Sequence, residues 1–90
     1  MARICLRLKV SGLVHGVFFR ATLASIASDE GVAGWVKNVP DGSVEALLEG
    51  DDKDVLKLLE WAKRGPPGAR VDSVKVEKQP VRNLRGFRIE

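Results

Sequence analysis

The sequence predicts an α+β fold in which two helices cover one face of an antiparallel sheet. Several short segments alternate apolar with polar residues, as half-buried strands do. Two segments between them repeat apolar residues at helical spacing. The resulting order is βαββαβ followed by a short fifth strand, which is the order of a split βαβ sandwich.

The first half of the chain predicts a strand, a loop and a helix. Residues 3–10 alternate apolar and polar side chains, which indicates a strand with one buried face. Ser11 to Phe19 break this alternation with two glycines, so we expect a loop there. From Arg20 to Glu30 the apolar residues fall at helical spacing, and Gly31 is the expected left-handed terminator of this helix.

The next two strands are joined by a tight turn. Val32 to Val39 predicts the second strand, which ends at the turn sequence Pro40-Asp41-Gly42. Ser43 to Glu49 alternates again and ends at Gly50, so we expect a return strand there.

A second helix and two strands complete the chain. Asp51 or Asp52 is expected to cap the helix, which stops at Gly65-Pro66-Pro67-Gly68. Val71 to Lys78 predicts a fourth strand, and a short final strand carries Phe87 and Ile89. The solvent face of the sheet is expected to carry five charged side chains, those of Arg7, Lys9, Glu45, Lys75 and Glu77.

Length and composition limit the class of protein. Ninety residues suffice for one core, so we expect residues 1–90 to form a single domain. No apolar run approaches the roughly 20 residues of a membrane span, and the N-terminal segment lacks the apolar block of a signal peptide. A cytoplasmic protein is therefore expected. Cys5 is the only cysteine, which excludes an internal disulfide and a multi-cysteine metal site.

Basic residues are concentrated near the start of the chain. Residues 1–20 carry four cationic side chains and no acid, whereas residues 29–60 are rich in acids. A basic first strand and loop would favour an anionic ligand. Scattered, solvated charge is the alternative explanation.

The loop after the first strand suggests an anion-binding site. Gly12 and Gly16 can adopt backbone angles that other residues avoid, and such a loop can turn successive N–H groups inward. It leads into a helix N-terminus, where free N–H groups favour anions. Arg20 stands at this junction, and its guanidinium can bind two phosphate oxygens. No Gly-Lys-Ser/Thr follows, which excludes a Walker loop and leaves a plain strand–helix connection as the alternative.

Asn38 is the second candidate site residue. By strand alternation it projects to the same face as Val36, which suits a buried position. Its amide both donates and accepts hydrogen bonds, so it can hold a water molecule in line with a phosphorus atom. Alternatively, Asn38 starts the turn by bonding its own backbone.

The two segments together resemble the acylphosphatase family. The residues that carry the resemblance are Gly12-Leu13-Val14-His15-Gly16-Val17-Phe18-Phe19-Arg20 and Gly34-Trp35-Val36-Lys37-Asn38, followed by Gly42, Val44 and Gly50. The similarity covers nearly the whole chain and reaches Gly86-Phe87-Arg88-Ile89.

This resemblance implies a ferredoxin-like sandwich that hydrolyses a carboxyl–phosphate anhydride to carboxylate and orthophosphate, without metal or organic cofactor. It implies that Arg20 binds the phosphate and that Asn38 orients the water. The implied phosphate loop consists of His15, Gly16, Val17, Phe18, Phe19 and Arg20. An acyl phosphate has a good leaving group, so positioning and charge stabilisation suffice without paired carboxylates. The substrate's own phosphate oxygen is a candidate acceptor for the water's proton.

His15 departs from the family pattern, in which glutamine is usual at this position. We favour a role for its backbone alone, because lone histidines seldom prove to be ligands or bases. If the side chain instead reached the ligand, activity would titrate near about pH 6.5. Thr22 is a possible support, either for Asn38 or for a neighbouring carbonyl. The aromatic side chains are interpreted as packing groups, namely Phe18, Phe19, Trp35 and Trp61.

Three other functions are alternatives for a chain with this order of elements. An RNA-binding domain of the same element order would display aromatic side chains on its central strands, whereas residues 4–10 offer only Arg7 and Lys9. A metal carrier would need a Cys-x-x-Cys loop. A phosphate- or carbamoyl-phosphate-binding module without turnover is the strongest alternative. The protein is expected to act on a small-molecule acyl phosphate and to bind neither nucleic acid nor membrane. We also expect it to be a monomer. The motifs do not specify the acyl group.

Overall fold

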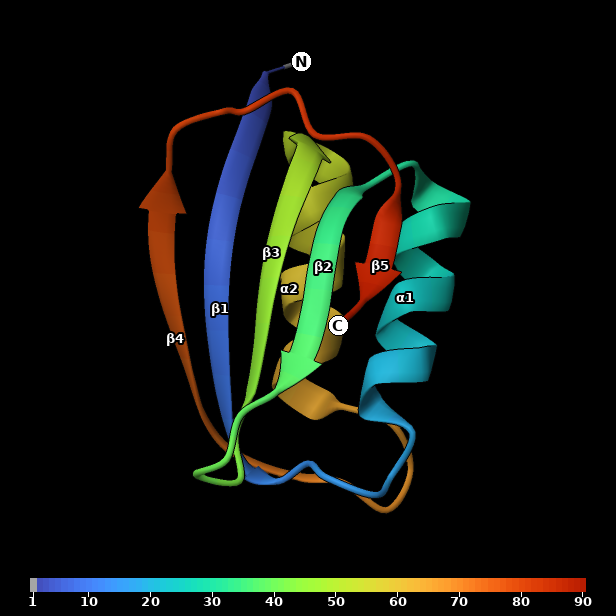
Figure 1. Ribbon diagram of the computed structural model, residues 1–90, viewed down its shortest axis with the longest axis vertical. Coiled ribbons are helices and arrows are strands. Elements are labelled where there is room, and N and C mark those ends of the chain that lie inside the picture. Colours follow the sequence, from blue (N-terminus) through green and yellow to red (C-terminus); the bar gives the residue numbers. More distant parts are fainter. Residues whose placement is uncertain (1) are drawn as a thin grey trace.

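A computed structural model describes residues 2–90 and places two helices on one face of a five-stranded sheet (Figure 1). The elements follow the predicted order. They are β1 (Arg3–Leu13), α1 (Phe19–Glu30), β2 (Ala33–Asn38), β3 (Val44–Asp51), α2 (Asp52–Arg64), β4 (Arg70–Gln79) and β5 (Phe87–Ile89). The α+β class and the fifth strand are thus confirmed.

The sheet is mixed, although we expected an antiparallel one. Its strand order is β4-β1-β3-β2-β5, and the pairs β1–β3, β1–β4 and β2–β3 are antiparallel. The short β5 pairs in parallel with β2. The cause is the connection after β4, which crosses one end of the sheet to the opposite edge before β5 begins (Figure 1). As a result, β5 runs in the same direction as β2 and ends beside it.

The hydrophobic core lies between the sheet and the helices. Alternate residues of β1 and β3 face the helices and are buried, as the period-two pattern predicted. The helices contribute their apolar stripes, including Leu23 of α1 and Leu58 of α2. Phe19 and Trp61 close one side of this core with ring centroids 5.1 Å apart. The packing roles expected for these two aromatic residues are therefore confirmed.

The first strand is longer than its sequence pattern indicated. β1 continues past Val10 to Leu13, with a bulge in its pairing to β4 between Ser11 and Gly12. Gly12 has φ 131°, and a Cβ at this position would collide with the carbonyl oxygen of Arg70. Gly12 thus has the unusual backbone angle that was expected, but it lies in β1, where it allows two strands to approach closely, and not in the anion-binding loop.

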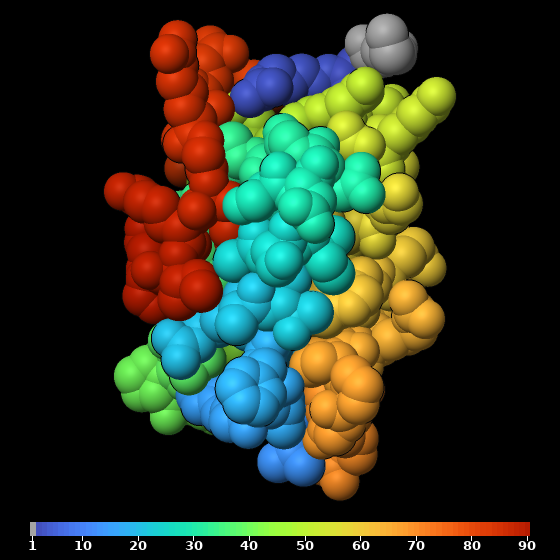
Figure 2. Space-filling view, turned by 90° about the vertical axis from the view of Figure 1, so that its right-hand side faces the viewer, coloured from blue at the N-terminus to red at the C-terminus, as the bar shows by residue number. Residues whose placement is uncertain are grey.

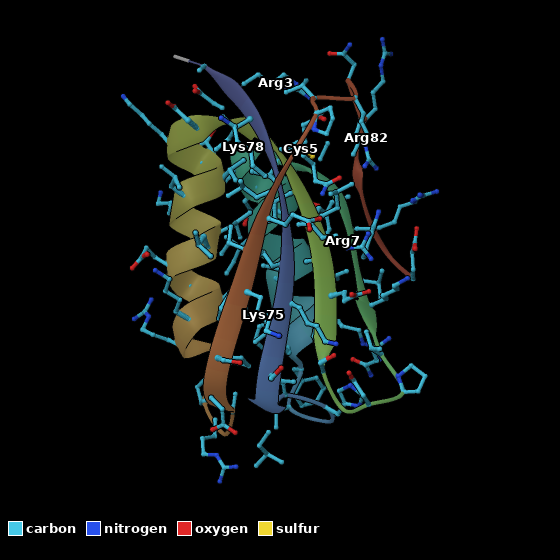
Figure 3. All side chains as sticks on the ribbon, turned by 90° about the vertical axis from the view of Figure 1, so that its left-hand side faces the viewer. Arg3, Cys5, Arg7, Lys75, Lys78 and Arg82 are labelled. Atoms are coloured by element: carbon cyan, nitrogen blue, oxygen red, sulfur yellow. The ribbon has the colours of Figure 1, made fainter. Side chains whose placement is uncertain are left out.

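Charged side chains cover the open face of the sheet, as predicted (Figure 3). Arg7 pairs with Glu45 at 3.3 Å, and the neighbouring strand β4 adds exposed Lys75 and Glu77. Trp35 also belongs to this face and packs beneath two cations rather than in the core. Its ring lies 5.7 Å from the Arg7 guanidinium carbon and 5.0 Å from the Lys37 amine.

A buried carboxylate fixes the connection between β4 and β5. Glu49 is fully buried and accepts hydrogen bonds from the backbone N–H groups of Arg82 (2.6 Å) and Leu84 (2.7 Å). It also accepts one from the Arg3 guanidinium at 3.0 Å. Arg3 and Arg82 accordingly meet at one end of the sheet, beside Cys5 (Figure 3). This contact holds the chain that leads into β5.

Candidate active site

A pocket of about 270 Å³ lies where β1, α1, β2 and β5 meet. Its lining residues are Val14, Gly16, Phe18, Phe19, Arg20, Ala21, Asn38 and Ile89. In Figure 2 the loop after β1 (blue) and the β2–β3 turn (green) adjoin on the lower part of the surface, and the C-terminal residues (red) lie above the turn on the left. The structure thus brings the two main predicted site residues, Arg20 and Asn38, to one cavity.

The loop before α1 has the backbone of an anion nest. Gly16 and Phe18 both have left-handed conformations, with φ of 72° and 62°. Within residues 2–90, the N–H groups of His15, Gly16, Phe18 and Phe19 make no backbone hydrogen bond. The first bond of the helix is donated by the Thr22 N–H to the Phe18 carbonyl at 3.0 Å, and Phe18 provides no side-chain cap. The loop and the first helical turn therefore present free donors at the pocket.

Arg20 lies in the first turn of α1 and is partly exposed. Its guanidinium forms no ion pair or hydrogen bond with any described residue. Hydrogen bonds to side chains are made by five of the other arginines, namely Arg3, Arg7, Arg70, Arg82 and Arg88, whereas Arg64 and Arg85 resemble Arg20 in making none with described residues. A cation without a protein partner, next to unpaired N–H groups, is suited to bind a polyoxygen anion.

Asn38 is the last residue of β2, and its exposed side chain lines the pocket. Val36, two residues earlier, is completely buried, so alternation directs both residues to the helix side as predicted. The alternative role, a side-chain bond that starts the turn, is taken by Asp41 instead. Its carboxylate accepts hydrogen bonds from the Ser43 hydroxyl (2.6 Å) and the Ser43 N–H (2.9 Å).

The β2–β3 turn is further fixed by charge. Lys9 of β1 forms an ion pair with Asp41 at 2.9 Å. The hydrogen bonds from Ser43, together with Lys9, hold the pKa of the Asp41 carboxyl well below its usual range. In turn, the hydrogen bond to Asp41 and the negative charge of Asp41 raise the pKa of the Lys9 amine. This turn directly follows Asn38, so its rigidity also restrains that amide.

His15 faces this turn and does not line the pocket. Its Nε2 lies 2.7 Å from the Ser43 carbonyl oxygen. A carbonyl only accepts hydrogen bonds, so Nε2 must carry the proton that it donates. The geometry agrees with the expectation that the His15 side chain does not contact the ligand, and it adds an anchoring role that the sequence did not suggest.

The remaining predicted residues divide between pocket and core. Val17 packs against the core, and Thr22 does not line the pocket. Phe18 was expected to be a packing group, but its side chain is 80% exposed, because the left-handed backbone turns it outward. Ile89 was missed: it reaches the pocket through the parallel pairing of β5 with β2, which no local pattern predicts.

Comparison with known proteins identifies the family of this chain. The family model described as Acylphosphatase matches residues 6–89. An acylphosphatase of Thermococcus kodakarensis is 45% identical over 99% of this chain and 98% of its own length. A solved acylphosphatase structure from Coxiella burnetii superimposes with a TM-score of 0.93 at 38% identity, covering 98% of this chain and 93% of that one. HypF of T. kodakarensis has a TM-score of 0.83 at 30% identity, and the match covers 97% of this chain but only 12% of HypF.

Proposed function

The chain belongs to the acylphosphatase family and hydrolyses the carboxyl–phosphate bond of acyl phosphates, and we propose that the pocket between β1, α1 and β2 performs this reaction. The observation that supports this location is the convergence of Arg20, Asn38 and the loop before α1 on one cavity. No other described cavity contains an arginine, an asparagine and a helix N-terminus together.

The phosphate group is bound by backbone and side chain together. Free N–H groups of the loop before α1 donate to its oxygens, and the Arg20 guanidinium binds two of these oxygens in a bidentate manner. The backbone donors are held in place by the loop before the substrate arrives. They can therefore stabilise charge on the equatorial oxygens as the bond to the leaving group lengthens.

Asn38 orients the water that attacks phosphorus. Its side-chain oxygen accepts a hydrogen bond from the water, and its NH₂ group remains free to bind a phosphate oxygen. A water held in line with the scissile bond has already lost the freedom that a reaction in solution must overcome. Since the side chain has no hydrogen bond within the described chain, it can take both roles at once.

The reaction forms one P–O bond and breaks another. The water oxygen bonds to phosphorus, and the P–O bond to the acyl group breaks, so that its electron pair leaves with the carboxylate. No carboxylate or imidazole lines the described pocket. The water's proton therefore passes to a phosphate oxygen of the substrate, and the products are carboxylate and orthophosphate.

A binding module without turnover is the second candidate. The similarity to HypF, of which this fold is about an eighth, shows that related folds also occur inside larger proteins. Hydrolysis of benzoyl phosphate by the purified protein, followed by the release of orthophosphate, distinguishes the two. Multiple turnovers per chain support the enzyme, whereas saturable binding without orthophosphate release would support the module.

We further propose that residues 1–90 act as one monomeric domain in the cytoplasm, with no nucleic-acid partner. The buried single thiol of Cys5 suits a reducing compartment. No described helix is both long and apolar enough to cross a membrane. On the open face of the sheet, several cations are paired with carboxylates, as in Arg7–Glu45 and Lys9–Asp41, which lowers the attraction for a polyanion.

A further inference from the structure

Phe18 is the most exposed of the large apolar side chains that the structure describes. Its exposed fraction is 80%, whereas those of the others range from 43% to 56%, namely Leu13, Leu56, Val76, Val81 and Ile89. It also has a left-handed backbone, with φ 62° and ψ 26°. Both features are unfavourable for the isolated fold, because a bulky side chain disfavours this conformation and an aromatic ring is preferentially buried.

The fold does not require an aromatic ring at this position. Glycine or asparagine would adopt the left-handed conformation more easily. The next residue, Phe19, is only 2% exposed and packs on Trp61. The turn therefore directs two successive aromatic rings to opposite sides, one into the core and one into solvent. Strained and exposed groups of this kind are concentrated at functional sites.

Phe18 lines the same pocket as Arg20 and Asn38. Ile89, 49% exposed, lines this pocket as well. Its position is fixed by β5, since Ile89 is paired with Val36 and the following N–H, of Glu90, donates to the Val36 carbonyl at 2.8 Å. Two of the exposed large apolar side chains thus lie around one polar site, although they are far apart in sequence.

We infer that Phe18 and Ile89 form an apolar subsite for the acyl group, so that this enzyme prefers aromatic acyl phosphates to acetyl phosphate. This inference rests on the proposed function, because it requires the phosphate to lie at Arg20 and the loop before α1. The carbonyl carbon is then one bridging oxygen away from phosphorus, and the acyl substituent extends toward the pocket mouth. An aromatic substituent there covers apolar surface and packs against the Phe18 ring in an offset or edge-to-face arrangement.

The test is the ratio of kcat/KM for benzoyl phosphate to kcat/KM for acetyl phosphate. Both substrates have the same reacting group, so a change in the common chemistry cancels in the ratio. We expect Phe18→Gly to lower the ratio about tenfold, as removal of one apolar contact in a specificity pocket does. Phe18→Tyr retains the ring and should retain the ratio, and Ile89→Ala should lower it by about threefold.

Leu56→Ala is the matched control, because Leu56 is an exposed apolar residue on α2 outside this pocket. It should leave the ratio unchanged. Glycine fits the left-handed backbone, and Phe18→Asn, which also fits, is a second variant that lacks the ring. If the wild-type protein is active and all Phe18 variants have the same ratio as the wild type, the inference of an apolar subsite is wrong, while the proposed function is unaffected. A wild-type protein that hydrolyses neither substrate would overturn the proposed function and, with it, the subsite.

Discussion

Arg20 and Asn38 line one pocket although they belong to different elements, the first turn of α1 and the last position of β2. The segments next to these two residues differ in a complementary way. Arg20 adjoins a loop with free N–H groups, whereas Asn38 is followed by a turn that Asp41 fixes. One element can therefore hold a phosphate while the other holds a water, and the predictions below test these separate tasks.

Asn38→Ala should affect the orientation of the water and leave phosphate binding in place, so kinetics can distinguish these two tasks. This variant retains the phosphate loop and Arg20, so inorganic phosphate should still inhibit it. The kcat for benzoyl phosphate should fall about a hundredfold, because the water loses the group that orients it. Steady-state rates and phosphate inhibition constants measure both quantities. A large loss of phosphate affinity with little change in kcat would mean that Asn38 binds the phosphate and does not orient the water.

His15 should affect stability and not the pH dependence of the rate. His15→Ala leaves the Ser43 carbonyl without its donor, which should lower the free energy of unfolding by about 1 kcal/mol. Urea unfolding measures this loss. The kcat/KM profile of the wild-type protein should be flat between about pH 5 and 8, because the imidazole faces the turn and not the pocket. A bell or step in that range that disappears in His15→Ala would instead make the side chain part of the reaction.

Glu49 should stabilise the fold through its carboxylate. Glu49→Gln removes the charge that accepts hydrogen bonds from Arg3, Arg82 and Leu84, and should lower the free energy of unfolding by about 2 kcal/mol. Glu45→Gln is the matched control on the same strand and face. Its ion pair with Arg7 is more exposed to solvent, so the loss should stay below about 1 kcal/mol. Equal losses in the two variants would contradict the role given to Glu49.

The same residue should make stability depend on pH. Burial raises the pKa of Glu49, but hydrogen bonds from the Arg82 and Leu84 N–H groups and from Arg3 outweigh this effect, so the pKa lies below its ordinary value. The folded state then binds fewer protons than the unfolded state. Its stabilisation is complete above about pH 4.5 and is lost as the pH falls through the lower folded pKa. Unfolding curves should therefore show a smaller loss below pH 4.5 in Glu49→Gln than in the wild type.

Gly34 should be irreplaceable for steric reasons. Its φ is 139°, and a Cβ there would collide with the Leu47 carbonyl across the β2–β3 pair. Gly34→Ala should destabilise the protein by about 3 kcal/mol, from strain and overpacking together. Gly31→Ala isolates the strain, because Gly31 has φ 72° and no atom near its Cβ position, and it should lose only about 1 kcal/mol. Thermal or urea unfolding that gives the same loss for both would show that the collision is relieved by small shifts.

Most of the fold and the centre of the site could be predicted from local patterns. Strand alternation predicted that Val36 is buried in the core and that Asn38 lies on the same side of the sheet. The helical spacing of apolar residues that begins near Arg20 predicted that Arg20 lies at the start of a helix. The exposure of Phe18 was not predictable, because its residue type does not indicate a left-handed backbone. Ile89 depends on a parallel pairing formed after the chain has crossed the sheet, which leaves no local signal.

The burial of Glu49 could not be predicted from the sequence for a related reason. Its position in β3 indicated the open face of the sheet, and alternation was correct in this respect. The connection between β4 and β5 then covers that end of the face and supplies two backbone donors. Burial by a distant loop depends on tertiary contacts, and no period within residues 44–51 reports it.

The central claim is that Arg20 binds the reacting phosphate. The most direct measurement compares benzoyl phosphate hydrolysis by the wild type, Arg20→Ala and Arg64→Ala at equal folded concentration. Arg64 is an exposed arginine at the end of α2, outside the pocket, and serves as the charge-matched control. We predict that Arg20→Ala lowers kcat/KM about a thousandfold, through loss of bidentate charge stabilisation, while Arg64→Ala retains wild-type turnover. Wild-type turnover in a folded Arg20→Ala protein would contradict the claim.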